Sequence, residues 1–100
     1  MLDRKEVEKV MSNRGFYIQM YYRQDGQVTS ITCNTMKCDG MDIACIINLE
    51  KETFRFEWCV PCSISRLVTP DCGSLFNDTH FDRLYKTIRQ QARVLYNTYC

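Results

Sequence analysis

The chain is poor in the residues that build several common kinds of active site. It has four glycines and one histidine among 100 residues. The glycines form no loop of the kind that cradles phosphate groups, and neither the HExxH zinc motif nor the EF-hand calcium loop occurs. One histidine leaves a single candidate for a catalytic base, and the acidic residues near the N-terminus belong to a predicted first helical turn. We therefore expect a protein that is not an enzyme.

The chain also lacks a long hydrophobic run and an excess of one charge. No apolar stretch approaches the roughly 18 residues that mark a membrane span. The N-terminus, MLDRKEVEKV, carries charges where a secretory signal needs an apolar run. The net charge is +1, so no overall field draws the chain to nucleic acid or to an anionic membrane. We expect a cytoplasmic protein with no membrane contact, folded as a single domain over residues 1–100.

What the chain has in unusual number is cysteine, with seven. In a secreted protein they would suggest a disulfide framework, but the number is odd and no export signal is visible. We expect reduced thiols, some of them possible metal ligands. Cys45, between Ile43 and Ile47, is expected in the core.

The hydrophobic pattern predicts two helices with strands between them. A helix is expected over residues 2–14, capped by Asp3, and residues 16–23, 28–36, 41–49 and 53–60 alternate as strands do. Asp25-Gly26 suits a tight hairpin turn. Residues 61–76 show no period, and from residue 78 an apolar stripe recurs as in a long helix.

These elements predict an α+β fold, a two-layer sandwich of an N-terminal helix, a four-stranded antiparallel meander and a long C-terminal helix. Both helices should cover the sheet face that carries Phe16, Ile18, Met20, Tyr22, Ile43 and Trp58. The other face should stay open to solvent or to a partner. It is expected to carry Tyr17, Tyr21, Arg23 and Arg55.

The stretch WCVPC, residues 58–62, resembles the WCxPC motif of thioredoxins. That resemblance implies a redox pair at the start of a helix, followed by a further helix, two strands and a last helix. Here an irregular segment and one helix follow, and the resemblance covers these few residues only. Trp58 is expected to anchor the core from the last strand, which Pro61 ends.

A zinc site is the alternative for the cysteines. The predicted ligands are Cys59, Cys62 and Cys72, with Cys38 or His80 as the fourth. Cys72-Gly73 also resembles the cysteine-glycine step of zinc knuckles. Cys33 lies about 16 Å from Cys38 along an extended strand, too far to share one ion. Cys59 should point to the open face, away from His80, and all of these cysteines could instead be buried as small hydrophobes. Cys72 with His80 is the one candidate pair for nucleophilic catalysis.

Two surfaces are candidates for binding. One is a basic ridge on the long helix, formed by Arg83, Lys86, Arg89 and Arg93, with Asp82 as the nearby counter-charge. The other is the open sheet face, where tyrosine and arginine could stack single-stranded bases. Either could also be a plain solvated surface.

Three functions remain open at this point. We expect a small non-enzymatic intracellular interaction module, a regulator or inhibitor that docks a protein partner, as a monomer or homodimer. Compact inhibitors that phages make against bacterial defence enzymes look similar in composition. A single-stranded nucleic-acid-binding domain is the second alternative, because a meander followed by a helix is similar in layout to Pur-like domains. A zinc-stabilised domain is the third.

Overall fold

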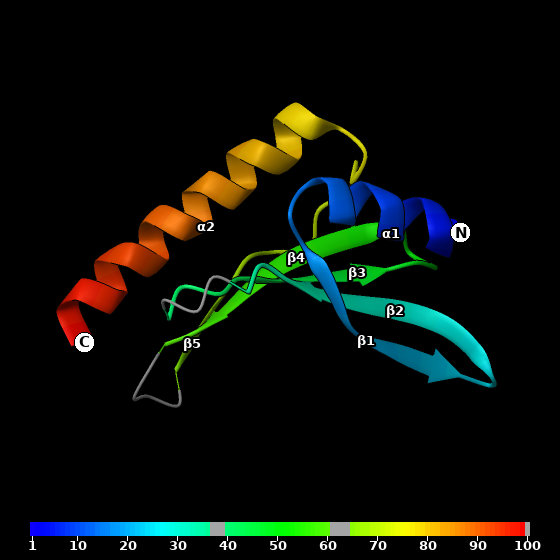
Figure 1. Cartoon of the computed structure of the whole chain (residues 1–100), viewed down its shortest axis with the longest axis horizontal. Coiled ribbons are helices and arrows are strands. Elements are labelled where there is room, and N and C mark those ends of the chain that lie inside the picture. The colour runs from blue at the N-terminus through cyan, green and yellow to red at the C-terminus, as the bar shows by residue number, and fades with distance from the viewer. Residues whose placement is uncertain (37–39, 61–64, 100) are drawn as a thin grey trace.

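The computed structural model describes residues 1–36, 40–60 and 65–99. In chain order the elements are α1 (Arg4–Asn13), β1 (Tyr17–Gln24), β2 (Gln27–Asn34), β3 (Ala44–Asn48), β4 (Thr53–Cys59), β5 (Arg66–Val68) and α2 (Asp78–Tyr99). The strands form one antiparallel sheet in the order β1-β2-β3-β4-β5. Both helices lie on the same side of this sheet (Figure 1). The predicted α+β fold is confirmed, with one strand more than expected.

Helix α1 begins and ends where its capping residues allow. The side chain of Asp3 accepts a hydrogen bond from the backbone N–H of Lys5 at 3.2 Å, which satisfies one of the free donors at the helix start. Gly15, at φ 85°, turns the chain out of the helix in a conformation that other residues rarely adopt. Val7 and Met11, four residues apart, are fully buried and fix the orientation of α1 on the sheet.

The first hairpin has the turn that its sequence predicts. Asp25 and Gly26 both have positive φ angles, 53° and 78°, as a two-residue turn between β1 and β2 requires. Strands β2, β3 and β4 then pair without interruption, so that Ile31, Ile47 and Phe54 lie side by side across the sheet.

Residues 66–72, part of the segment predicted to be irregular, run along the outer side of β4. Val68 in β5 lies opposite Glu57, and Cys72 forms a single bridge with Phe54. Between them, the hydroxyl of Thr69 accepts a hydrogen bond from the backbone N–H of Phe56 at 2.9 Å. Strand β5 has three residues, which is too short for an alternating pattern to be read from the sequence.

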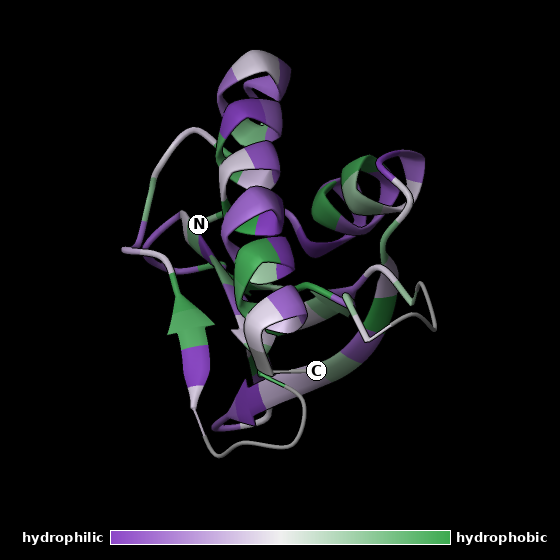
Figure 2. Cartoon of the chain, turned by 90° about the vertical axis from the view of Figure 1, so that its left-hand side faces the viewer, coloured by the Kyte–Doolittle hydropathy of each residue, from purple (hydrophilic) through white to green (hydrophobic). Residues whose placement is uncertain are grey.

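The core lies between the sheet and the two helices. Phe16, Phe54, Phe56 and Phe81 meet there, with neighbouring ring centroids 5.1–5.8 Å apart. Other fully buried side chains come from the sheet and from both helices, among them Val7, Met11, Ile31, Cys33, Ile43, Cys45, Ile47, Leu49, Trp58, Ile88 and Ala92. Hydrophilic and hydrophobic positions recur along α2, as a helix covered on one side needs (Figure 2). Among the described residues, no helix is both long and apolar enough to cross a membrane.

Arg14 joins the two helices. Its guanidinium lies 4.0 Å from the ring centroid of Phe81 and 2.6 Å from a carboxylate oxygen of Asp78. The arginine side chain is 13% exposed, whereas that of Asp78 is 87% exposed. Because the carboxylate is solvated, packing of the arginine against the ring contributes more to this joint than the ion pair does.

Gly40 joins the sheet to the C-terminal half of α2. Its carbonyl oxygen accepts a hydrogen bond from Nε1 of Trp58 at 3.0 Å. A Cβ atom at this position would lie 2.7 Å from Cε2 of Tyr96, and the backbone has φ 79°. Gly40 is therefore required both for its conformation and for its lack of a side chain.

We predict that Gly40→Ala destabilises the fold more than Gly26→Ala. Gly26 has nearly the same angle, φ 78°, but nothing lies within 4 Å of its missing Cβ. Gly26→Ala should lower the free energy of unfolding by about 1–2 kcal/mol, the cost of left-handed backbone. Gly40→Ala should lower it by about 1–3 kcal/mol more, because Tyr96 must move. Urea denaturation measures both, and equal losses would show that the Tyr96 contact contributes nothing.

Candidate functional site

The sheet face turned away from the helices, called here the open face, carries its side chains in three rows set by the strand register. The rows are Tyr17, Asn34, Ala44, Glu57 and Val68; Met20, Thr32, Ile46 and Arg55; and Tyr22, Ser30, Asn48 and Thr53. No described helix covers this face (Figure 1). Tyr17 and Arg55 lie on it, as predicted.

Tyr21 and Arg23 do not lie on the open face, and this part of the prediction is wrong. The register of β1 against β2 shifts between Ile18 and Met20, so that Gln19 is an extra residue in β1. Such a bulge reverses the alternation of the residues that follow it. Tyr21 therefore lies beside Ile31 of the buried face, and Met20 and Tyr22, predicted for the core, lie on the open face.

Tyr21 instead contacts α1 and holds β1 against this helix. Its hydroxyl donates a short hydrogen bond to the carboxylate of Glu8, and the guanidinium of Arg4 lies 5.4 Å from its ring centroid. Arg4 and Glu8 also form an ion pair at 3.8 Å. The hydrogen bond to Glu8 raises the pKa of the Tyr21 hydroxyl. This cluster is held by its own members, so Tyr21 serves the fold.

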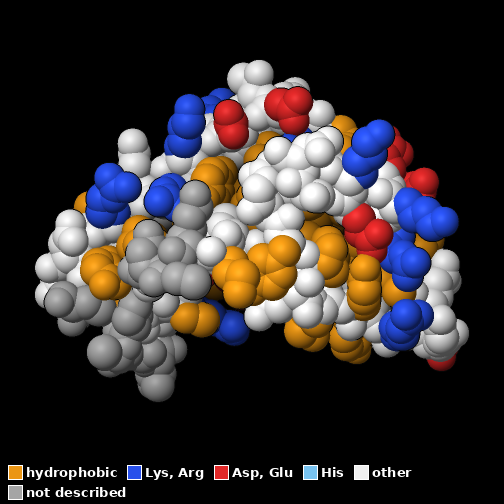
Figure 3. Space-filling model, in the orientation of Figure 1, with side chains coloured by type: hydrophobic (Ala, Val, Ile, Leu, Met, Phe, Trp, Pro, Cys, Tyr) orange, Lys and Arg blue, Asp and Glu red, His pale blue; other side chains and the backbone are white. Residues whose placement is uncertain are grey.

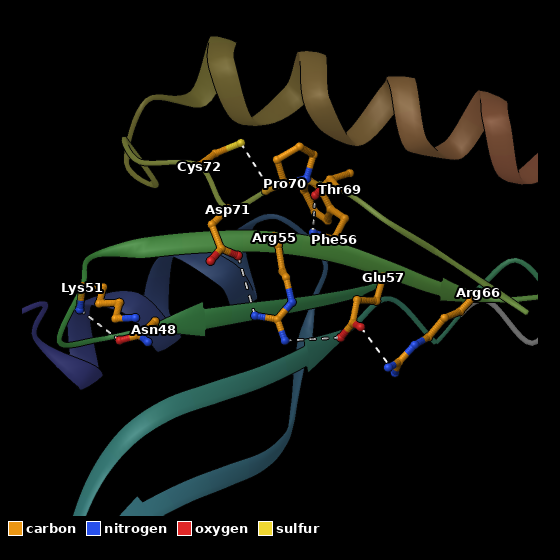
Figure 4. Close-up of polar contacts among 10 residues, drawn as sticks. All are labelled: Asn48, Lys51, Arg55, Phe56, Glu57, Arg66, Thr69, Pro70, Asp71 and Cys72. Carbon is orange, nitrogen blue, oxygen red and sulfur yellow. Dashed lines mark hydrogen bonds and ion pairs between the residues drawn. The ribbon is translucent and has the colours of Figure 1, made fainter.

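A chain of ion pairs crosses the open face at the β4 and β5 side (Figure 4). Arg55 lies 3.9 Å from Glu57 and 3.7 Å from Asp71, and Arg66 lies 3.5 Å from Glu57. These are long, partly exposed pairs, which contribute little to stability. Both arginines of this face therefore have carboxylate neighbours.

Next to these ion pairs the open face is hollowed. The hollow has a volume of about 490 Å³, and its walls mix polar, apolar and charged groups. They include Gln19, Thr32, Asn34, Asp42, Ala44, Ile46, Glu57, Cys59 and Arg66. The mixture fits the side chains of a protein surface better than one small ligand, for which a pocket is mostly apolar and enclosed.

Large apolar side chains are exposed along β1. Among the described residues, nine large hydrophobic side chains are exposed, and four of them are Tyr17, Met20, Tyr21 and Tyr22. Met20 is 54% exposed and Tyr22 is 60% exposed. Tyr17, Met20 and Tyr22 share the open face and are called here the β1 surface. In Figure 3, hydrophobic side chains gather on the side where Figure 1 draws β1. The sequence did not predict this surface, because no residue type near Gln19 indicates a bulge there.

The basic ridge lies on the opposite side of the molecule. Phe81, Ile88 and Ala92 of α2 are buried toward the sheet, so the ridge residues Arg83, Lys86 and Arg93 face solvent. Arg83 lies 3.1 Å from Nδ1 of His80, and Arg89 donates to the hydroxyl of Tyr85 at 3.3 Å. Within the described part of the chain, none of the four ridge cations forms an ion pair.

The cysteines predicted as zinc ligands are divided by the sheet. Cys59 is exposed and lines the hollow of the open face, as predicted. Cys72, opposite the buried Phe54, points toward α2 (Figure 4). Cys38 and Cys62, like Pro61, lie outside the described residues. In the ranges that are described, no three His, Cys, Asp or Glu residues are close enough to hold one metal ion.

Cys72 and His80 both lie near Phe54 but are not directed at each other. The ring of His80 packs edge-on against Phe54, with centroids 6.1 Å apart. The thiol of Cys72 donates to the carbonyl of Pro70 at 3.4 Å, and Nδ1 of His80 meets Arg83. This is not the hydrogen-bonded arrangement of a nucleophile and its base.

Comparison with models of protein families, with curated proteins and with solved structures gives no match. The surfaces of the molecule are therefore the basis for any functional proposal. Of these, the β1 surface, the hollow beside it and the basic ridge are the candidates.

The cysteines differ sharply in expected reactivity. Cys33 and Cys45 are fully buried neighbours across β2 and β3, whereas Cys59 is exposed. Burial raises the pKa of the Cys33 thiol to about 12 and raises that of Cys45 as well. Only the thiolate is a nucleophile, so both buried thiols should be inert near neutral pH.

We predict that iodoacetamide at mildly alkaline pH alkylates Cys59 before Cys33 or Cys45. Cys33 should react at least about 100-fold more slowly, because each unit of raised pKa lowers the thiolate fraction about tenfold. Fragment-resolved mass spectrometry of timed samples separates the sites. In denaturant the three should react alike, and fast alkylation of Cys33 in the folded protein would contradict the prediction.

Proposed function

We propose that this protein is a non-enzymatic interaction module that docks another protein through the β1 surface and the adjoining hollow. The observation that carries the proposal is the clustering of exposed Tyr17, Met20 and Tyr22 on one strand of an uncovered sheet face. Burying a Met or aromatic side chain is worth about 1.5–3 kcal/mol. Met20 and Tyr22 leave more than half of their surface in water, which is typical of a binding surface.

The composition of the surface supports a protein partner. Tyrosine, methionine and arginine are enriched in protein interfaces, and aromatic anchors supply most of the binding energy there. The β1 surface provides two tyrosines and a methionine, and the hollow beside them provides polar groups that can pair at its rim. We infer a regulator or an inhibitor that acts by occupying its partner through this surface. An inhibitor of a host defence enzyme, as phages make, is one form of this proposal.

The charges of the open face argue against nucleic acid there. Arg55 and Arg66 pair with Glu57 and Asp71, and Asp42 lines the same hollow, which leaves the face with no positive excess. Single-stranded nucleic acids need a positive groove that follows the phosphates. Stacking on Tyr17 and Tyr22 would bring phosphates near these carboxylates.

We predict that Met20→Glu with Tyr22→Glu abolishes partner binding. Tagged protein incubated with lysate of its native cells should retain a defined partner, and the double variant should retain at least about tenfold less, since losing a central interface residue costs about 2 kcal/mol or more. Val94→Glu is the matched control, because Val94 is 64% exposed on α2. Quantitative proteomics compares the three. A partner that survives the β1 change, or is lost equally from the control, would contradict the proposal.

Single-stranded nucleic-acid binding by the basic ridge is the second candidate. It is favoured by the four ridge cations, which form no ion pair in the described ranges. An oligonucleotide titration at low and moderate salt tests it. Binding should weaken steeply with salt and disappear in Arg83→Glu with Lys86→Glu, while Met20→Glu with Tyr22→Glu should leave it unchanged. Absence of binding at low salt removes this candidate.

A further inference from the structure

The two edges of the sheet are protected differently. On the β5 side, a three-residue strand bears the charged Arg66 and leads into Pro70, which has no N–H to offer a further strand. On the other side, β1 is eight residues long, contains no proline and has Arg23 as its one charge. Long edge strands with few charges and no proline are templates for another strand. Of the two edges, only β1 has this character within the described chain.

We infer that the outer edge of β1 binds an extended segment of the partner protein, which pairs with Met20–Gln24 as an added strand and places a carboxylate beside Arg23. This inference rests on the proposed function and names the form of the partner. Strand addition takes its affinity from main-chain hydrogen bonds and its specificity from the side chains on either face.

The regular part of β1 defines where the segment pairs. Gln19 is the extra residue of the bulge, and the second irregularity, beside Tyr22 and Arg23, adds its extra residue to β2. From Met20 to Gln24 the backbone of β1 is therefore continuous. Side chains of the added strand beside Met20 and Tyr22 would cover the β1 surface, so those positions should be apolar.

The helix-facing side of the same stretch selects an acidic residue. Arg23 and Arg4 line a hollow of about 310 Å³ together with apolar Leu2, Val28 and Leu49. No acidic residue lines it. Arg4 has Glu8 at 3.8 Å, but the guanidinium of Arg23 forms neither an ion pair nor a hydrogen bond within the described residues. A carboxylate on the residue opposite Arg23 would meet two guanidinium groups, whereas a cationic residue would be repelled.

The same charge argument excludes a second copy of this chain as the occupant. Self-pairing would place β1 against β1, and the strand sequence YIQMYYRQ contains no acidic residue. Arg23 would then lie beside a strand without a carboxylate. A strand from a different protein, apolar on one face and acidic on the other, complements the edge better.

Selection from a phage-displayed library of random linear peptides tests the inference without knowledge of the partner. Enriched peptides should carry Asp or Glu next to apolar residues. When a synthesised peptide is bound, hydrogen exchange measured by mass spectrometry should slow over Met20–Gln24. Arg23→Glu should weaken binding at least tenfold, and Arg83→Glu, the matched single charge reversal on α2, should not.

Each other outcome overturns a distinct part of the idea. Peptides that depend on Met20 and Tyr22 but leave β1 exchange unchanged would refute strand addition and keep the proposed function. Enrichment of basic peptides, or full binding by Arg23→Glu, would refute the acidic segment. A concentration-dependent dimer with slowed β1 exchange would make a second copy the occupant. Failure to select any peptide sensitive to changes in β1 would refute the inference, and the proposed function would still be judged by the lysate experiment.

Discussion

The alternation of side chains along β2, β3 and β4 is the constraint on which the rest of the structure depends. Ile31, Ile47 and Phe54 lie in register on one side, and the next row, Cys33, Cys45 and Phe56, is buried with them. Because the side-chain period of a strand is two, burying these rows forces Thr32, Ile46 and Arg55 to the other side. Both helices then cover the same apolar face of the sheet. The opposite face is left open because the same alternation places its side chains there.

The alternation of side chains along β1 is interrupted at a single residue, Gln19. The bulge at Gln19 moves Tyr21 toward α1, where Glu8 and Arg4 hold it, and moves Met20 and Tyr22 away from the core. A strand at the edge can accept such a shift, since it has a neighbour on one side only. The contact with α1 and the exposed β1 surface are therefore two consequences of one extra residue.

Much of the fold could be predicted from the sequence because its signals are local. Asp3, Gly15 and Asp25-Gly26 mark helix and hairpin ends through their own backbone preferences, and the apolar stripe of α2 repeats over many turns. The candidate site was harder to predict. The sheet face on which Met20, Tyr21, Tyr22 and Arg23 lie depends on the register of β1 against β2. Strand β5 forms because residues 66–68 pair with the edge of β4. Such features are decided by pairing between distant segments, which single-residue propensities do not report.

The distribution of charge differs between the open face, the β1 side and the basic ridge. The open face balances its arginines with carboxylates at the β4 and β5 side, whereas Arg23, at the β1 side, has no such neighbour. The basic ridge, across the molecule, has solvent as its surroundings. Exposed cations alone bind weakly and with little selectivity. Where a cation lies beside exposed apolar side chains and a free strand edge, it can bind selectively. Pairing of the backbones fixes the position of the residue that would meet the cation. Only the β1 side combines all three features among the described residues, so specific recognition is expected there rather than on the ridge.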